Sequence, residues 1–322
     1  MSRKIYTRND ARPALIGMGL GARRLMFICL AQLERESSKD NVVIKFDSSQ
    51  SFLIRVCDYA ELCSIDYSAA YRQVVEGMKE LRGYVLEADQ GLLKKRDNSI
   101  PEDAIEPFTI AERGTWYSKG DGSVNIKFAK EMEPLISNLK GNFTGQFLLS
   151  AMHLPDGNAG KLYLILREWI SSGFIVDKTL DVSEFKESLG LSTHKNYESY
   201  PFFKQSFFDR AIKKLIEKTE FTDIKMEIVE RRARKAYRVK VSYHYDEKSI
   251  NKRDKVVDNV LNKTEINQEK KKVLKENKGS LQEDTLFFIF ANRYLDRNGA
   301  KALNLDWELG LTAQEVLDKL SK

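Results

Sequence analysis

The residues in this chain that are best suited to chemistry are cations, spaced so that they can meet a row of phosphates. Four of them, Arg231, Arg232, Arg234 and Lys235, occupy one five-residue stretch between two segments of alternating polarity. A turn made of cations buries nothing, so folding alone does not explain it. A hairpin tip that follows a phosphate backbone or enters a minor groove does explain it. The alternative interpretation is a solubilising turn.

A second group lies on a helix that the sequence predicts at 200–220. Its apolar residues recur at helical spacing and predict a buried stripe: Phe207, Phe208, Ala211, Ile212 and Leu215. Hydroxyl, amide, ammonium and guanidinium groups on the rest of its surface are suited to base edges and phosphates. The predicted DNA contacts of this helix are Lys204, Gln205, Ser206, Arg210 and Lys213. Asp209 would repel phosphate unless it reads a cytosine or holds Arg210.

The local charge supports this interpretation more than the total does. The chain of 322 residues has a formal net charge of +6, which is modest for a nucleic-acid-binding protein. Between Asn196 and Tyr245, however, 12 Lys or Arg residues stand against 7 Asp or Glu residues. A concentrated positive patch attracts phosphate whatever the base sequence. An ordinary solvated face remains the alternative for charge alone.

Two stretches of the chain repeat one plan that would position these cations. The first combines a short helix within 52–65 with a long helix at 68–87, and the second combines 178–191 with 200–220. A short helix, a turn, a longer helix and a β-hairpin make up a winged helix, which presents its second helix to the major groove. On the first long helix, the predicted contacts are Ser68, Arg72 and Lys79.

Smaller signals predict details of the modules. Gly120-Asp121-Gly122 indicates the tight turn of the first hairpin, and the helix that opens the first module is expected at 22–36. The counterpart in the second module should begin after 155–160. Asp58 and Ser183 stand where helix N-caps are expected. We interpret Gly17-x-Gly19-x-Gly21 as a flexible lead-in.

The fold class expected is α+β, with two tandem winged-helix domains and a short helical C-terminal extension. The predicted division is an N-terminal arm at 1–14, a first winged helix at 15–145, a second at 146–245, a charged linker at 246–282 and a helical tail at 283–322.

Enzyme motifs are missing from the sequence. His153, His194 and His244 are isolated, no two Asp residues are two apart, and Gly160-Lys161 lacks the rest of a phosphate loop. We therefore expect no catalytic residue, metal or cofactor. Three cysteines form no even disulfide framework, and the apolar run Ala14–Ala22 is shorter than the ~18–20 residues of a membrane span. A reducing cytoplasm is the expected location.

From about Leu15 to Tyr245, the chain resembles the iteron-binding plasmid replication initiators, the Rep family with two winged-helix domains. The resemblance rests on the order and spacing of DYAEL and AYRQV, WYSKGDGSVNIKFAKEMEPLISNL, KLYLIL, VSEFKESLGL, and the run from YPFFKQSFF to YRVKV. Family members carry a Phe and three basic residues at the start of the second long helix. Here that cluster reads Phe203-Lys204-Gln205-Ser206, with one basic residue, which suggests a different repeat sequence.

The resemblance implies binding to direct repeats in a plasmid origin, melting of neighbouring A·T-rich DNA, and recruitment of the host initiator and replicative helicase. It also implies a monomer–dimer equilibrium, with dimers formed through the first winged helix repressing the chain's own gene. The main alternative is a dedicated winged-helix transcriptional repressor. A ligand-responsive regulator would need a sensor domain, which the segment beyond Asp246 does not resemble.

Overall fold

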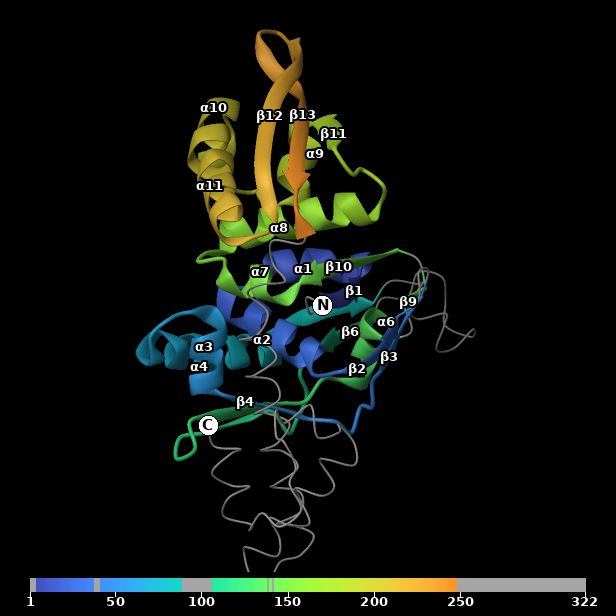
Figure 1. The fold of residues 1–322 in the computed structure, drawn as a ribbon, viewed down its shortest axis with the longest axis vertical. Coiled ribbons are helices and arrows are strands. Elements are labelled where there is room, and N and C mark those ends of the chain that lie inside the picture. Colours follow the sequence, from blue (N-terminus) through green and yellow to red (C-terminus); the bar gives the residue numbers. More distant parts are fainter. Residues whose placement is uncertain (1–3, 38–40, 89–105, 138, 141, 248–322) are drawn as a thin grey trace, which may run out of the picture. The chain divides into compact units, whose positions relative to one another are not determined.

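The structure, a computed structural model, describes residues 4–37, 41–88, 106–137, 139–140 and 142–247. All of them belong to one unit, Met1–Val257. Along it, two helix–turn–helix modules with β-hairpins follow one another (Figure 1). The predicted helical tail at 283–322, and all of the predicted linker except 246–247, lie outside the described residues. No described helix is both long enough and apolar enough to cross a membrane.

The helix pair of the first module consists of α3 (Val56–Cys63) and α4 (Tyr67–Gly83). Beside it lies an antiparallel sheet in the order β4–β8–β7. Its strands are β4 (Phe52–Arg55), β7 (Trp116–Ser118) and β8 (Ser123–Ile126). The predicted turn at Gly120–Gly122 joins β7 to β8, with Gly122 at a φ of 56°, which confirms the glycine signal.

Helix α2 (Leu20–Ala31) crosses α4 at a contact between two glycines. A Cβ atom on Gly77 would lie 2.5 Å from the carbonyl carbon of Gly21, and one on Gly21 would lie 2.5 Å from the Gln73 oxygen. The two backbones therefore touch, which glycine permits because it has no Cβ. The expectation of a flexible lead-in was wrong, since Gly19 is the N-cap of α2 and Gly21 belongs to a helix crossing.

The remaining elements of the first module are short strands and short helices. They are β1 (Lys4–Arg8), η1 (Asn9–Ala11), α1 (Arg12–Gly17), β2 (Glu34–Ser37), β3 (Asn41–Lys45), β5 (Val85–Ala88), β6 (Glu106–Thr109), η2 (Lys130–Met132), α6 (Glu133–Ile136), β9 (Leu139–Lys140) and β10 (Phe143–Phe147). The helix expected at 22–36 was too long: it ends at Ala31, because 34–37 pair with 42–45 instead. The boundary at residue 14 stays a prediction, although β1 pairs with β10.

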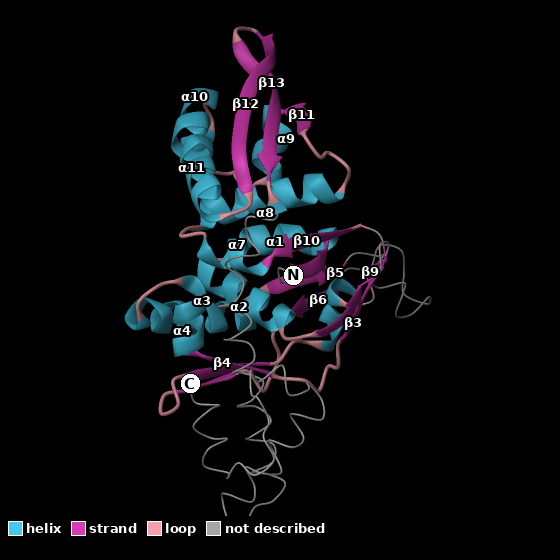
Figure 2. Ribbon diagram, viewed as in Figure 1, coloured by secondary structure: helices cyan, strands magenta, loops and turns pink. Residues whose placement is uncertain are grey.

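The boundary predicted between the modules at residue 145 stays a prediction. Helices α7 (Leu148–His153) and α8 (Gly157–Ser171) come next, followed by the separate elements of the second helix–turn–helix and its hairpin (Figure 2). These are β11 (Asp177–Asp181), α9 (Val182–Ser188), η3 (Lys195–Tyr197), α10 (Tyr200–Phe202), the π-helical η4 (Phe203–Phe208), α11 (Asp209–Lys218), β12 (Phe221–Arg232) and β13 (Lys235–Tyr245). The sheet order is β11–β13–β12. The helix predicted after 155–160 is confirmed as α8, and Asp156 caps it by accepting from the Ala159 N–H at 2.9 Å.

The N-caps predicted at Asp58 and Ser183 were wrong. Helix α3 starts at Val56, so Asp58 lies in its first turn, where it accepts from Arg55 at 2.7 and 2.8 Å. Ser183 likewise lies in the first turn of α9, whose N-cap is Asp181. Each helix begins earlier than the short polar residue suggested, because its first apolar residue, Val56 or Val182, is itself buried.

A buried polar cluster fastens the base of the second hairpin. Glu220 accepts from Ser150 Oγ at 2.8 Å, Tyr163 Oη at 3.1 Å and Arg167 Nη1 at 3.2 Å. Arg167 also donates to the Gly145 oxygen of β10 at 2.9 Å. Burial raises the pKa of Glu220, and Arg167 opposes that shift. The cluster ties the hairpin to α8 and to the preceding module.

Candidate nucleic-acid interface

The long helix of the second module runs from Tyr200 to Lys218 and has a π-helical segment near its start. Ser199 caps it by accepting from the Phe202 N–H at 3.4 Å. Within the π-helical segment Phe203, Phe207 and Phe208 are all buried, and the rings of Phe203 and Phe207 stack with centroids 5.6 Å apart. We call this helix, 200–218, the recognition helix. The burial predicted for Phe207 and Phe208 is confirmed, Phe203 is buried with them, and Phe202 is exposed.

The antiparallel pair β12–β13 forms the wing, and its two-residue turn is Ala233-Arg234. Both residues have positive φ, 46° and 66°. This conformation belongs to the type I′ hairpin turn, which normally uses Asn and Gly. An L-residue in the left-handed region costs about 1–2 kcal/mol. Such strain persists where the surrounding structure holds it, and it gathers at functional sites.

The recognition helix and the wing enclose an open groove of ≈ 940 Å³. We call it the basic groove. Its cations come from four places, namely α9, the turn before the recognition helix, that helix itself and the wing: Lys186, Lys195, Lys204, Arg231, Arg234 and Lys235. The acidic residues that line it are Glu198 and Asp209. Converging cations of this kind suit a phosphate backbone.

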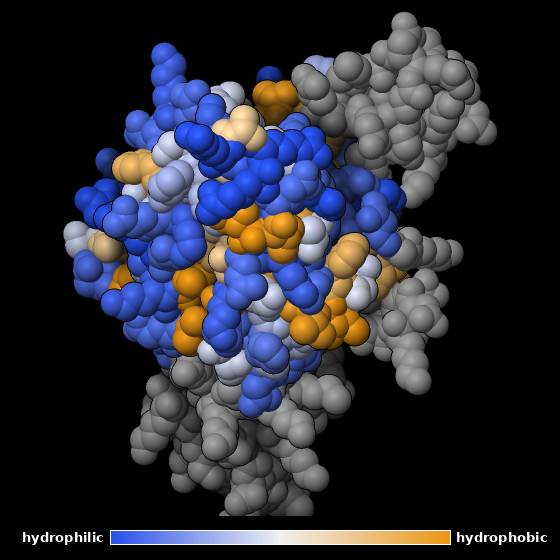
Figure 3. Space-filling model, turned by 90° about the horizontal axis from the view of Figure 1, so that it is seen from above, coloured by the Kyte–Doolittle hydropathy of each residue, from blue (hydrophilic) through white to orange (hydrophobic). Residues whose placement is uncertain are grey.

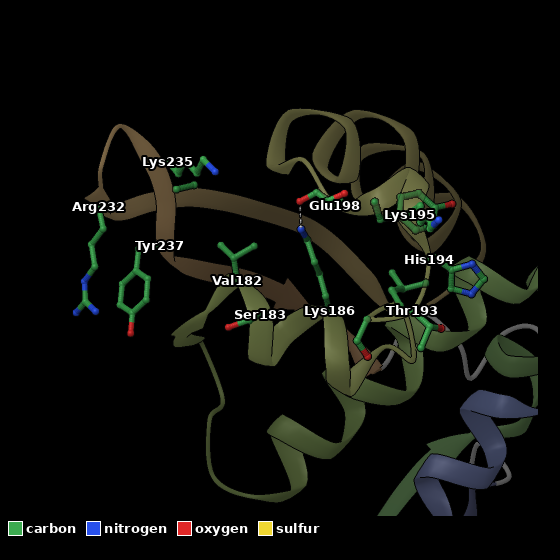
Figure 4. Close-up of a pocket in the computed structure, with 14 residues that line it drawn as sticks. Val182, Ser183, Lys186, Thr193, His194, Lys195, Glu198, Arg232, Lys235 and Tyr237 are labelled. Atoms are coloured by element: carbon green, nitrogen blue, oxygen red, sulfur yellow. Dashed lines mark hydrogen bonds between the residues drawn. The ribbon is translucent and has the colours of Figure 1, made fainter.

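A second groove of ≈ 550 Å³ lies beside the first and shares Lys186, Lys195 and Lys235 with it. Figure 4 shows Arg232, Lys235 and Tyr237 of the wing on one side of this groove and Thr193 and His194 on the other. Lys186 crosses between them and donates to the Glu198 main-chain oxygen at 2.8 Å. Partial burial lowers the pKa of Lys186, and Glu198 opposes this. Seen from the wing-tip end, the described surface is mostly hydrophilic, with separate hydrophobic patches (Figure 3).

The structure brings together only some of the predicted contact residues. Lys204, Gln205, Arg231, Arg234 and Lys235 line the basic groove. Arg232 lines the second groove and is held by Glu230, with Nε and Oε1 2.8 Å apart. Ser206, Arg210 and Lys213 line neither groove: Arg210 and Lys213 are exposed along α11, whereas Ser206 is half-buried.

Helix α4 carries the three contacts predicted for the first module, and they are not part of these grooves. Ser68, Arg72 and Lys79 are all exposed on α4. The start of α4 contacts the first hairpin, where the rings of Tyr71 and Tyr117 meet edge to face with centroids 5.6 Å apart. The modules thus provide two separate candidate surfaces for DNA.

The DNA contacts predicted from the sequence did not include Lys186 and Lys195, which line the basic groove. Lys186 lies on the short helix α9 and Lys195 in the connection to the recognition helix. Their position in the sequence could have indicated this location, because the first helix and the turn of such a module flank the groove that the second helix enters. Within the described residues, no three His, Cys, Asp or Glu side chains gather as metal ligands would.

Both modules match models of known protein families. Residues 4–167 match the model described as "Initiator Replication protein, WH1", and residues 181–243 match "Initiator Rep protein, WH2". The chain belongs to the two-domain initiator replication protein family. These matches confirm the predicted α+β class with two winged helices, and they confirm the predicted family. They favour the initiator over the dedicated repressor.

Individual relatives agree with this assignment. The chain is 30% identical over 268 residues to the "PI protein" of Escherichia coli, a match that covers 76% of this chain and 83% of that protein. It is 25% identical over 218 residues to an "Uncharacterized 27.6 kDa protein" of Escherichia coli, covering 67% and 86%. A crystal structure of the Pi initiator protein in complex with iteron DNA matches with a TM-score of 0.64 and 28% identity, covering 76% of this initiator and 98% of that chain.

Proposed function

We propose that this initiator binds direct repeats, or iterons, in a plasmid origin and starts replication there. The observation that carries the proposal is the basic groove, in which six cations from four parts of one module face the space between a recognition helix and a wing. The solved relative bound to iteron DNA supports the same class of ligand. Phosphate contacts of this kind supply affinity and orientation, and base contacts from the helix supply specificity.

The residues divide into two roles. Ser206, Arg210 and Lys213 are the side chains of the recognition helix that we assign to the major groove, with Gln205 at its start. Arg231, Arg234 and Lys235, with Lys186 and Lys195, hold phosphates. Ser68, Arg72 and Lys79 give the first module its own DNA contacts, so that one chain covers two adjacent parts of a repeat.

We extend the proposal to the downstream steps that the family resemblance implies. Bound initiator promotes melting of a neighbouring A·T-rich segment and recruits the host initiator and replicative helicase. Dimers formed through the first winged helix repress the initiator's own gene. The protein acts in the bacterial cytoplasm, on its plasmid, without a cofactor or catalytic chemistry of its own.

The test is a protection experiment on the DNA that flanks the coding region. Purified full-length protein should protect a series of direct repeats of about one to two helical turns each, beside an A·T-rich stretch that becomes reactive to a single-strand probe. A plasmid that carries this region should replicate only when the protein is supplied. Protection of a single inverted repeat over the promoter, with no effect on replication, would instead support the repressor.

A separate assay addresses catalysis. With Mg²⁺ or Mn²⁺, the purified protein should neither nick a supercoiled origin plasmid nor hydrolyse ATP. Turnover that persists through further purification, or a covalent protein–DNA adduct, would contradict the non-enzymatic role.

A further inference from the structure

Lys204 and Asp209 form an ion pair across the π-helical segment of the recognition helix. Lys204 Nζ lies 2.8 Å from Asp209 Oδ1 and 3.1 Å from Oδ2, so both carboxylate oxygens accept. Residues five apart on a regular α-helix point about 140° away from each other and do not meet. A π-helix closes its turns between residues i and i+5. The π-helical segment is therefore what brings these two side chains together.

The core fixes this register. Phe203 and Phe207 have no exposed surface, and Phe208 is 1% exposed. Phe185 of α9 contacts two of these rings, with centroids 5.8 Å from Phe203 and 6.1 Å from Phe208. Returning the segment to a regular α-helix would rotate at least one buried ring out of the core. The position of Asp209 relative to the basic groove is thus set by packing.

An acidic residue in this groove opposes the binding of phosphate. Asp209 is about 42% exposed, so its carboxylate is open to a ligand, and it lines the groove together with six cations. Lys204 neutralises the carboxylate while leaving its oxygens partly accessible. A carboxylate accepts hydrogen bonds and donates none. In the major groove, the amino groups of cytosine and adenine donate, whereas thymine O4 and guanine O6 and N7 accept. Cytosine N4 is the donor that Asp and Glu carboxylates pair with, since adenine presents its acceptor N7 beside its amino group and is paired by Asn or Gln.

We propose that Asp209 is a specificity-determining residue that accepts a hydrogen bond from the amino group of a cytosine in the repeat. Lys204 is the residue that positions it, because it orients the carboxylate and shields it from the neighbouring phosphates. This inference rests on the proposed function, since it assigns one base contact within the same DNA complex. The structure excludes the alternative that Asp209 holds Arg210, because its carboxylate accepts from Lys204 instead.

The experiment is competition binding of the full-length protein to its repeat and to duplexes in which each base pair is replaced in turn. For the wild-type protein, replacing one C·G pair by T·A should weaken binding about 5- to 150-fold. Asp209→Ala should lose that preference at that position and keep the preferences at the others. Asp209→Ala should also bind scrambled DNA more tightly, because Lys204 is then free to contact phosphate.

Matched variants distinguish base recognition by Asp209 from a general effect of charge on DNA binding. Glu217→Ala removes another exposed carboxylate of the same helix, one that pairs with Lys218 at 2.9 Å and lies outside the basic groove. It should leave the base profile unchanged. Lys204→Ala should weaken binding to every duplex, because the unshielded carboxylate repels phosphate, and adding Asp209→Ala should restore the affinity for scrambled DNA.

Two results would overturn the inference, and they differ from a failure of the proposed function. If Asp209→Ala weakened all duplexes by one factor and lowered the melting temperature, the ion pair would only stabilise the π-helical segment. If its base profile equalled that of the wild-type protein, Asp209 would read nothing. A wild-type protein that did not distinguish its repeats from scrambled DNA would instead refute the proposed function itself.

Discussion

The guanidinium carbon of Arg232 lies 3.4 Å from the centroid of the Tyr237 ring, and Arg232 Nε donates to Glu230 Oε1 at 2.8 Å. Figure 4 shows the Arg232 and Tyr237 side chains next to each other on the wing. Arg232 is therefore held along the wing by partners of its own. Arg234, at the strained turn, is exposed and has no hydrogen bond or ion pair with another described residue. We therefore expect Arg232 and Arg234 to contribute differently to phosphate binding, although both belong to one hairpin tip.

Arg234→Ala should weaken cognate and scrambled DNA by similar factors and lower the salt slope by about one phosphate. Arg232→Ala should change the slope less, because its charge is already shared with Glu230. The measurement is a salt titration of both variants by fluorescence anisotropy. A larger loss of slope for Arg232→Ala would reverse these assignments.

Arg210→Ala should lower the specificity of the protein for its cognate repeat. Arg210 is exposed on α11 and no described residue pairs with it, so it is available for a base edge. We expect a cost of ~1–3 kcal/mol on the cognate repeat and much less on scrambled DNA, which narrows the ratio between them. Lys225→Ala is the control, because Lys225 is an exposed cation on β12 that is already paired with Asp223 at 2.7 Å. Equal losses on both duplexes for Arg210→Ala would make it a phosphate contact.

Gly77→Ala should destabilise the first module, because the new methyl group would lie 2.5 Å from the backbone of α2. Overpacking of this kind costs about 1–3 kcal/mol or more. Gly83→Ala changes the same residue type at the end of the same helix, where nothing lies within 4 Å, and it should be neutral or slightly stabilising. Thermal unfolding followed by circular dichroism measures both. Similar melting temperatures for the two variants would mean that the α2–α4 crossing adapts.

Asp156→Ala should cost about 0.5–2 kcal/mol at pH 7, since Asp156 caps α8. It also pairs with Lys214 of α11. Burial opposes ionisation of this carboxyl, but the Ala159 N–H and Lys214 prevail and lower its pKa. A lowered folded-state pKa stabilises the fold above the unfolded value of ~3.9, and this stabilisation is lost as the pH falls through the folded value.

Urea unfolding of the wild-type protein and Asp156→Ala, from pH 7 down to pH 3, tests this sign. The difference between the two should shrink on acidification below about pH 4. Asp156→Asn keeps a capping oxygen and loses the charge, so it should fall between them. A difference that grew toward low pH would contradict the lowered pKa.

The sequence predicted features that depend on local periodicity. Leu162, Ile165, Leu166 and Trp169 recur at helical spacing, and all are buried on α8. The alternating residues of β12 and β13 likewise pair in register, with Met226 opposite Val241. In these cases each residue's own neighbours along the chain determine which face is buried.

Features that depend on distant partners could not be predicted in this way. Residues 34–37 form a strand because 42–45 pair with them, and Gly21 is needed because Gly77 crosses it. The π-helical segment, whose three phenylalanines are buried and two of which contact Phe185 of α9, brings Lys204 into a pair with Asp209. Lys186 and Lys195 differ from these features, because their place in the first helix and the turn of the module was a signal that the sequence predictions did not use.

We propose that a phosphate-dominated, sequence-specific surface on this chain binds origin repeats. The most direct measurement is the dissociation constant for the cognate repeat and for a scrambled duplex between 50 and 200 mM salt. If ~6–10 phosphates are neutralised, the affinity for the repeat should fall by ~10³–10⁵ over this range and stay above that for scrambled DNA throughout. A salt slope near zero, or equal affinities for the two duplexes, would contradict sequence-specific binding dominated by phosphate contacts.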